Sequence, residues 1–417
     1  RMRKTFKLGA VAAAAALVLA ACSSGGGDKA ESGEEKAPEK VDGAGVTLTI
    51  WTDENREAAI TEAAAEFSEA TGATVEVVQK NFDDLRTDFI SQVSAGGGPD
   101  ITVGAHDWLG ALVAEGVVNT IDLGDKKNEF EKVTVDAFTY DGQLYGLPYA
   151  SEAMALVRNT DLVGDEDIKD FEELLAKGNE AGVERPFVVG IGDGGNMYNT
   201  YAFQTSFDAP VFVQSADGSY TNEVGMGGEN GQKFAEWMAA QGADGVLSTT
   251  VDNDIAQELF TSGKAPFALV GPWTISALKD AGMGENIKVS KIPSAGGKEA
   301  SPFVGVQGFY LSSKSANALL ATNFITEYLG SEKTQQALYD SDPRIPAMTK
   351  LADKYRDDPI IGGFIESASV GVPMPSIPEM GDVWDLWNNS QVQILGGADP
   401  VATWDKMVAD LEAAVAG

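Results

Sequence analysis

Residues 46–103 read VTLTIWTDENREAAITEAAAEFSEATGATVEVVQKNFDDLRTDFISQVSAGGGPDITV, and the pattern of apolar residues in this segment indicates the fold class. Apolar and polar side chains alternate over residues 46–52, which predicts a strand, and apolar side chains recur at helical spacing over residues 55–71. The pattern continues as strand, helix, strand and helix at residues 74–79, 83–94, 100–103 and 106–114. Strands that alternate with helices form a parallel sheet covered on both faces, and a ligand then binds beyond the carboxyl ends of the strands. We therefore predict an α/β fold in which the loops after Thr52 and Val103 are walls of a binding site.

The chain beyond this stretch contains a second set of strands and helices. Residues 144–149 and 153–157 are predicted to be extended segments that cross from one lobe to another, and the second set begins near Phe187. Further strands are expected at residues 267–270, 287–292 and 303–311, and helices at residues 272–279, 317–339, 379–394 and 400–415. Since a single core rarely serves more than roughly 250–300 residues, a chain of this length is expected to form two lobes.

The N-terminal residues have the pattern of an export signal. Four cationic residues precede an uncharged run that ends in Leu-Ala-Ala-Cys at Cys22. Residues 8–21 are too few to span a membrane, which takes roughly 20 apolar residues, so residues 1–21 are predicted to be a signal peptide. Leu-Ala-Ala-Cys resembles the bacterial lipobox, which implies a lipid on Cys22; the alternative is an ordinary secretory signal with an incidental cysteine. Residues 22–45, rich in Gly, Ser, Glu and Lys, are expected to be a flexible tether.

The composition excludes several classes of function. The chain has 30 Lys and Arg against 63 Asp and Glu, a formal net charge of −33, and so acidic a protein repels the phosphates of nucleic acids. Its one histidine, His106, leaves no multi-histidine zinc site, so neither a metal nor a cofactor is expected. His106 is interpreted as a residue at a helix start that bonds to backbone, because no Gly-x-Ser-x-Gly motif accompanies it. The one cysteine excludes a disulfide within the chain.

Three other patterns carry less information. Residues 190–195 read Gly-Ile-Gly-Asp-Gly-Gly, which has the form of a dinucleotide fingerprint, but the aromatic segment that follows favours a flexible turn beside a ligand. Residues 161–170 are rich in carboxylates, yet their spacing does not match a calcium-binding loop, and a solvated surface is expected. Paired carboxylates of a glycosidase remain an open alternative in a chain this acidic.

The placement of the seven tryptophans favours a sugar ligand. A sugar offers an apolar face of C–H groups and a rim of hydroxyls, so its site needs flat aromatic rings beside carboxylates, amides or guanidinium groups. Such mixtures occur at Trp51 with Asp53, Asn55 and Arg56, and at Asp107 with Trp108. Trp273 follows Gly-Pro at a predicted strand-to-helix turn, and Trp384 lies in a helix after a proline-rich loop, so both indoles are expected to be available to a ligand. Trp237 and Trp404, which lie inside amphipathic helices, are expected in the core.

An ordered set of short stretches runs along the chain. These stretches are Leu48-Thr49-Ile50-Trp51, Gly98-Pro99-Asp100-Ile101, Ala105-His106-Asp107, Glu152-Ala153, Gly271-Pro272-Trp273, Pro302-Phe303-Val304-Gly305-Val306, Met374-Pro375-Ser376-Ile377-Pro378 and Trp384. Taken together they resemble the maltose/maltodextrin-binding proteins, the extracellular solute-binding family that serves ABC importers. The resemblance implies a two-lobed, periplasmic-binding-protein-like fold with the ligand cleft between the lobes. It implies an N-lobe of residues 46–150 and 308–352, and a C-lobe of residues 151–307 and 353–417.

The resemblance also implies roles for individual residues: hydroxyl acceptors at Asp107 and Glu152, stacking platforms at Tyr198, Trp273 and Trp384, and further polar contacts at Asp53, Asn55 and Arg56. It implies a binding protein, not an enzyme, that captures maltose or a malto-oligosaccharide by hinge closure and delivers it to the permease subunits. Such a protein is expected to be a monomer on the extracellular face of the cytoplasmic membrane, held there through its lipid anchor only.

Four positions depart from the family pattern. A stacking tryptophan that some members carry before Ala-His-Asp is Gly104 in this chain, and the usual arginine after it is Trp108. Near Trp384, the family's tyrosine and arginine are Asp385 and Asn388. These departures fall in the outer subsites, so the length and linkage of the sugar do not follow from the resemblance. Two alternatives stay open: an extracellular enzyme that acts on glycans, and a receptor for a cationic solute that is not a sugar.

Overall fold

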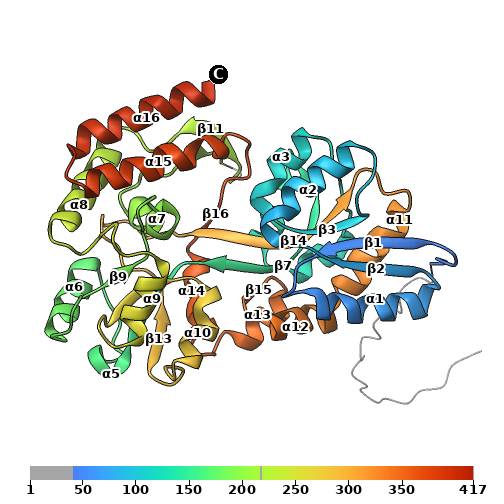
Figure 1. The fold of residues 1–417 in the computed structure, drawn as a ribbon, viewed down its shortest axis with the longest axis horizontal. Coiled ribbons are helices and arrows are strands. Elements are labelled where there is room, and N and C mark those ends of the chain that lie inside the picture. The colour runs from blue at the N-terminus through green and yellow to red at the C-terminus, as the bar shows by residue number, and fades with distance from the viewer. Residues whose placement is uncertain (1–40, 217, 417) are drawn as a thin grey trace, which may run out of the picture. The chain divides into compact units, whose positions relative to one another are not determined.

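The computed structural model describes residues 41–216 and 218–416 (Figure 1). The predicted signal peptide, Cys22 and residues 23–40 of the predicted tether lie outside the described residues. The described residues from Val41 onward belong to one compact unit. Within the two described ranges, no helix is both long enough and apolar enough to cross a membrane.

The larger sheet continues the strand and helix order predicted for the N-terminal stretch. Its strands, counted over the described residues, are β1 (Thr47–Thr52), β2 (Thr74–Gln79), β3 (Ile101–Ala105), β4 (Val118–Asn119), β7 (Gly146–Ala153), β14 (Phe303–Ser312), β15 (Ile345–Pro346) and β16 (Val372–Pro373). They are joined in the order β15-β7-β14-β3-β1-β2, and β4 and β16 also pair with β14. β1 is parallel to β2 and β3, whereas β14 is antiparallel to β3 and β7. The predicted parallel arrangement is therefore confirmed for the first three strands, and later antiparallel strands extend it.

A smaller sheet is formed by later segments. Its strands in the described part of the chain are β8 (Ala155–Asn159), β9 (Val188–Val189), β12 (Phe267–Val270) and β13 (Ile287–Ser290), in the order β13-β8-β12-β9. Among the described residues, two short hairpins stand apart from both sheets: β5 (Thr139–Tyr140) with β6 (Gln143–Leu144), and β10 (Phe212–Gln214) with β11 (Tyr220–Val224).

The chain passes between the two sheets along β7 and β14. Met154 alone separates the end of β7 from the start of β8, so one strand leads directly from the larger sheet into the smaller one. β14 lies beside β7 and runs in the opposite direction, as Figure 1 shows. Its two ends lie in different cores, because Phe303 packs with the smaller sheet and Phe309 with the larger.

Helices cover both sheets. The α-helices are α1 (Glu57–Thr71), α2 (Phe82–Ser94), α3 (Leu109–Ala114), α4 (Lys132–Ala137), α5 (Thr160–Val163), α6 (Phe171–Glu180), α7 (Met197–Ser206), α8 (Gly228–Ala243), α9 (Asn253–Thr261), α10 (Ile275–Asp280), α11 (Ala318–Asn323), α12 (Glu332–Ser341), α13 (Thr349–Tyr355), α14 (Ile361–Ser369), α15 (Met380–Leu395) and α16 (Pro400–Ala416). The 3-10 turns are η1 (His106–Trp108), η2 (Gly124–Glu129) and η3 (Pro272–Thr274), and η4 (Phe324–Leu329) is a π-helix. Side-chain caps begin several helices; the Asp252 carboxylate, for example, accepts from the N–H of Ile255 at 2.9 Å.

One of the predicted helices is interrupted. The prediction of a single helix over residues 317–339 is wrong, because the helix ends at Gly330 and begins again as α12. The hydroxyl of Ser331 caps the new helix by accepting from the N–H of Thr334 at 3.2 Å. A side chain at Gly330 would lie 2.6 Å from the carbonyl oxygen of Thr326, so this close approach requires glycine. Gly followed by Ser was the sequence signal for the break.

The predictions for the two helical tryptophans are confirmed. Trp404 is fully buried in the core of the smaller sheet, where its Nε1 donates to the carbonyl oxygen of Met226 at 2.9 Å. Trp237 is partly buried and packs against the same core.

Candidate functional site

A cavity of about 330 Å³ lies between residues of the larger sheet and residues that surround the smaller one. The predicted ligand-binding residues that line it are Asp107, Glu152, Tyr198, Trp273 and Trp384. Ala105, Gly305, Val306, Gln307 and Met374 complete its lining. Folding therefore brings together side chains from widely separated parts of the chain.

Trp273 forms an open aromatic wall of the cavity. It lies in the turn η3 that follows β12, and 44% of its surface is exposed. Pro272 begins this turn, and the hydroxyl of Thr274 donates to the carbonyl oxygen of Gly271 at 2.8 Å. Gly271 allows this orientation of the indole, because a Cβ at position 271 would lie 2.1 Å from the ring of Trp273 and would displace it. The exposed indole is available to stack on a flat apolar surface.

Tyr198 and Trp384 complete the aromatic side of the cavity. The ring centroids of Tyr198 and Trp273 lie 6.5 Å apart. Phe303 supports both residues from the core, 6.1 Å from Tyr198 and 6.4 Å from Trp384 between ring centroids. Burial raises the pKa of Tyr198, and nearby carboxylates, Glu152 first, raise it further. The hydroxyl of Tyr198 therefore stays protonated and is available as a hydrogen-bond donor.

The glycine-rich segment of residues 190–195 leads into α7 and places Tyr198, but it does not line the cavity. A Cβ at Gly195 would lie 2.5 Å from the carbonyl oxygen of Asn388, so the two backbones approach closely. The side-chain oxygen of Asn388 then accepts from the N–H of Met197 at 2.9 Å. Asn388, one of the four departures from the family pattern, thus holds the first turn of α7, the helix that carries Tyr198.

Asp107 lies in the turn η1 at the carboxyl end of β3, next to His106. The N–H of Val306 donates to Nδ1 of His106 at 2.9 Å, so Nε2 carries the ring hydrogen and donates to the carbonyl oxygen of Met374 at 2.8 Å. The prediction that His106 bonds to backbone is confirmed. His106 therefore ties together three parts of the cavity lining, which are the Asp107 turn, β14 and the Met374 loop.

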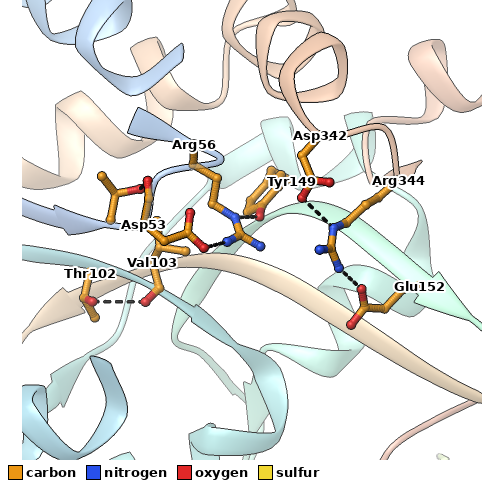
Figure 2. A network of polar contacts seen from close by, with 9 residues as sticks. Asp53, Arg56, Thr102, Val103, Tyr149, Glu152, Asp342 and Arg344 are labelled. Carbon is orange, nitrogen blue, oxygen red and sulfur yellow. Dashed lines mark hydrogen bonds and ion pairs between the residues drawn. The ribbon is translucent and has the colours of Figure 1, made fainter. Parts of the chain in front are cut away.

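Glu152 is held by Arg344 (Figure 2). Nη1 of Arg344 donates to Oε2 of Glu152, and Nε of Arg344 donates to Asp342 at 2.8 Å. Burial lowers the pKa of Arg344, but Glu152 and Asp342 outweigh burial and raise it, so the guanidinium stays charged. A Cβ at Gly305 would lie 3.3 Å from Oε1 of Glu152, so this second oxygen lies beside a residue that lines the cavity.

Asp53 and Arg56 are close together but lie outside the cavity, where they form a buried ion pair (Figure 2). Arg56 donates from Nη1 to Asp53 and from Nε to the hydroxyl of Tyr149. Burial lowers the pKa of Arg56, but Tyr149 and Asp53 outweigh burial and raise it. The pair ties the end of β1 and the start of α1 to β7.

The structure also places Asn55 and Trp108 outside the cavity lining. Asn55 is exposed, whereas Trp108 is buried and packs on Phe82 with ring centroids 5.3 Å apart. A Cβ at Gly104 would lie 2.7 Å from the Trp108 ring. Two departures from the family pattern therefore depend on each other, because Gly104 leaves the space that Trp108 fills.

Sequence reasoning missed Arg344 and Gln307. Arg344 follows Asp-Pro in a connecting segment, and nothing in the sequence pairs it with Glu152. Gln307 did carry a signal, since it is a polar residue inside a strand whose residues are all buried, and buried polar groups need partners.

The arrangement is suited to an uncharged, flat molecule rich in hydroxyl groups. Aromatic rings from around the smaller sheet face Asp107 and Glu152 from the larger sheet. Rings bind an apolar C–H face, and ionised carboxylates accept hydrogen bonds from hydroxyls. Over the residues that the structure describes, no group of three or more His, Cys, Asp or Glu is placed to hold a metal ion.

Replacing Arg56 by Met is expected to lower the free energy of unfolding by about 3–5 kcal/mol, because the Asp53 carboxylate then stays buried without a compensating charge. The double variant D53L/R56M removes both charges and is expected to recover most of this loss. Urea unfolding measures both effects. Lys406→Met, which removes an exposed pair with Asp410, is the control and is expected to leave the unfolding midpoint unchanged. An Arg56→Met variant as stable as this control would contradict the assigned role of the buried pair.

Comparison with known proteins identifies the fold and the family. The crystal structure of a cyclo/maltodextrin-binding protein complexed with maltotetraose matches with a TM-score of 0.79 and 30% identity, over 89% of this chain and 96% of that chain. The galactooligosaccharide-binding protein of Bacillus subtilis is 28% identical over 89% of this chain and 90% of that protein. The maltooligosaccharide ABC transporter solute-binding lipoprotein of Streptococcus pneumoniae is 29% identical over 96% of this chain and 94% of that protein.

These comparisons confirm the resemblance to the maltodextrin-binding proteins and the two-lobed, periplasmic-binding-protein-like fold. The relatives are binding proteins, so the alternative of an enzyme that acts on glycans is set aside. The profile of the bacterial extracellular solute-binding proteins matches residues 62–362, which is well over half of the chain. The chain therefore belongs to the family of bacterial extracellular solute-binding proteins.

Proposed function

We propose that this protein is the receptor of an ABC sugar importer and that it binds maltose or a malto-oligosaccharide. The observation that carries the proposal is one cavity of about 330 Å³ in which three aromatic rings face two carboxylates. This volume is at the low end of the range for small-molecule pockets, roughly 300–1,000 Å³. The relatives named for maltooligosaccharides and maltotetraose support the same class of ligand.

The proposed contacts divide between the two sides of the cavity. Trp273 and Trp384 stack on the apolar faces of the sugar rings, and the hydroxyl of Tyr198 donates to the sugar. Asp107 and Glu152 accept from sugar hydroxyls, with Glu152 held in place by Arg344. Asp53 and Arg56 have no direct contact in this proposal, because they lie buried outside the cavity lining.

The proposed mechanism is closure of two lobes around the sugar. Residues 46–150 and 308–352 form one lobe, and residues 151–307 and 353–417 form the other. A sugar stacked on Trp273 of one lobe and bonded to Asp107 of the other makes both sets of contacts only when the lobes are closed. Because a ligand shifts a conformational equilibrium only by its extra contacts in one state, these bridging contacts stabilise the closed form that the permease recognises.

We further propose that the mature protein is a monomer attached to the extracellular face of the cytoplasmic membrane by a lipid on Cys22. The relative from Streptococcus pneumoniae, a lipoprotein by name, supports the anchor. In the described part of the chain, the exposed large apolar side chains are Ile255, Trp273 and Leu319, which lie on the separate elements α9, η3 and α11. Scattered apolar side chains do not form the contiguous patch that a stable dimer interface needs.

Thermal unfolding with a panel of ligands tests the proposed function. Maltose, maltotriose or maltotetraose, at concentrations far above their Kd, is expected to raise the melting temperature by several degrees, because a ligand that binds only the folded state stabilises it. Galacto-oligosaccharides and the cation putrescine are included in the same panel. A shift with a galacto-oligosaccharide alone would correct the sugar class, and a shift with putrescine alone would replace the proposal by the cationic-solute alternative.

Replacing Trp273 or Trp384 by Ala is expected to weaken maltotriose binding by about 30-fold or more, because each indole is proposed to carry a stacked ring. Isothermal titration calorimetry measures the affinity, and thermal unfolding without ligand checks the fold. Trp237→Ala is the control; it lies outside the cavity and is expected to lower stability while leaving the affinity unchanged. Unchanged affinity in both cavity variants would remove these residues from the site.

Replacing Cys22 by Ser in the full-length precursor is expected to move the protein from the membrane fraction to the soluble fraction of its host. The physical reason is that the acyl chains on Cys22 are proposed to supply the apolar surface that is buried in the bilayer. Cell fractionation followed by immunoblotting measures the distribution. A Cys22→Ser protein that stays with the membrane would contradict the lipid anchor.

A further inference from the structure

Gln307 occupies the floor of the cavity, on the larger-sheet side. It lies in β14, opposite Ala105 of β3 and Ala150 of β7. Side chains two residues apart on a strand point to the same face, and Gly305 and Gln307 both line the cavity. Its cross-strand partners Ala105 and Ala150 have small side chains, and neither side chain can form a hydrogen bond with the Gln307 amide.

The amide of Gln307 is buried but not satisfied. The residue is 6% exposed, and within the described chain its Oε1 is buried with no hydrogen-bond partner. The other polar side chains of β14 have partners: the hydroxyl of Tyr310 donates to Ala105 at 2.8 Å, and the hydroxyl of Ser312 accepts from the N–H of Lys314 at 3.2 Å. Since a buried, unpaired polar group destabilises the folded state, an apolar side chain at position 307 would make the empty protein more stable.

Gln307 also differs chemically from the other polar groups of the cavity. The carboxylates of Asp107 and Glu152 only accept hydrogen bonds when they are ionised, and Arg344 already donates to one oxygen of Glu152. A side-chain amide both donates and accepts, and rotation about its last bond exchanges its oxygen and nitrogen. This pairing matches a sugar hydroxyl, which also donates and accepts.

We propose that the side-chain amide of Gln307 binds a hydroxyl group of the bound sugar, and that the ligand supplies the partner which this amide lacks in the empty protein. The inference rests on the proposed sugar-binding function. It makes Gln307 a specificity-determining residue, because a sugar without that hydroxyl leaves a buried amide unpaired.

The variant Gln307→Leu tests this inference, since leucine has a similar volume and no amide. The affinity for maltose, measured by calorimetry, is expected to fall roughly tenfold. The melting temperature of the unliganded variant is expected to equal or exceed that of the wild type, because the unpaired oxygen is gone. A residue that only supports the fold would show the opposite pattern, with a lower melting temperature and an unchanged affinity.

Gln335 provides a matched control. It is also buried with an unpaired Oε1 among the described residues, but it lies in α12, away from the cavity lining, and its Nε2 donates to the carbonyl oxygen of Leu329 at 2.9 Å. Gln335→Leu loses that bond, so it is expected to lower the melting temperature and to leave the maltose affinity unchanged.

A set of monodeoxy maltose derivatives identifies the hydroxyl. One derivative is expected to bind the wild type roughly tenfold more weakly than maltose does, while Gln307→Leu binds that derivative and maltose equally. If every derivative loses the same affinity relative to maltose in the wild type and in Gln307→Leu, the inference is overturned. If the wild type binds no sugar at all, the proposed function fails independently of this inference. In that case a melting temperature of unliganded Gln307→Leu below that of the wild type shows that the Gln307 amide stabilises the empty protein, which overturns the inference by itself.

Discussion

The antiparallel pairing of β7 with β14 holds together the cavity and the two sheets. The pair places Gly305 directly beside Glu152, and both residues line the cavity. The same two strands connect the cores, since β7 continues into β8 and β14 begins at Phe303 in the core of the smaller sheet. A shift of the register by one residue would turn every side chain of a strand to the opposite face. The positions of Glu152 and Gln307 in the cavity and the connection between the two sheets are therefore fixed by the backbone hydrogen bonds between β7 and β14.

The cavity separates its apolar and its charged groups. The rings belong to α7, η3 and α15, and Phe303 in the core packs against Tyr198 and Trp384. The carboxylates belong to β7 and to the turn after β3, where Arg344 and His106 hold the cavity wall. Burying a carboxylate is costly unless a cation or several donors compensate its charge. Arg344 supplies that compensation for Glu152, and Arg56 supplies it for Asp53 further from the cavity.

The sequence predicted those features that depend on local pattern or on chemistry common to sugar sites. The strands and helices of residues 46–103 follow from the spacing of their apolar side chains, and the exposed position of Trp273 follows from a proline-initiated turn after a strand. Asp53 and Arg56 were predicted to contact ligand because they combine charges with an adjacent indole. Arg56 instead donates to Tyr149, almost a hundred residues away, and a local pattern does not reveal such a contact. Trp108 is a similar case, since its position depends on the space beside Gly104.

Gly271 shows how a position without a side chain controls a neighbour's orientation. The indole of Trp273 lies back over this glycine so closely that even a methyl group would displace it. The orientation of the Trp273 ring therefore depends on Gly271, a residue that has no side chain with which to contact a ligand. A substitution of Gly271 would therefore change the orientation of the Trp273 ring, and with it the choice of ligand, while every residue that contacts the ligand stays the same.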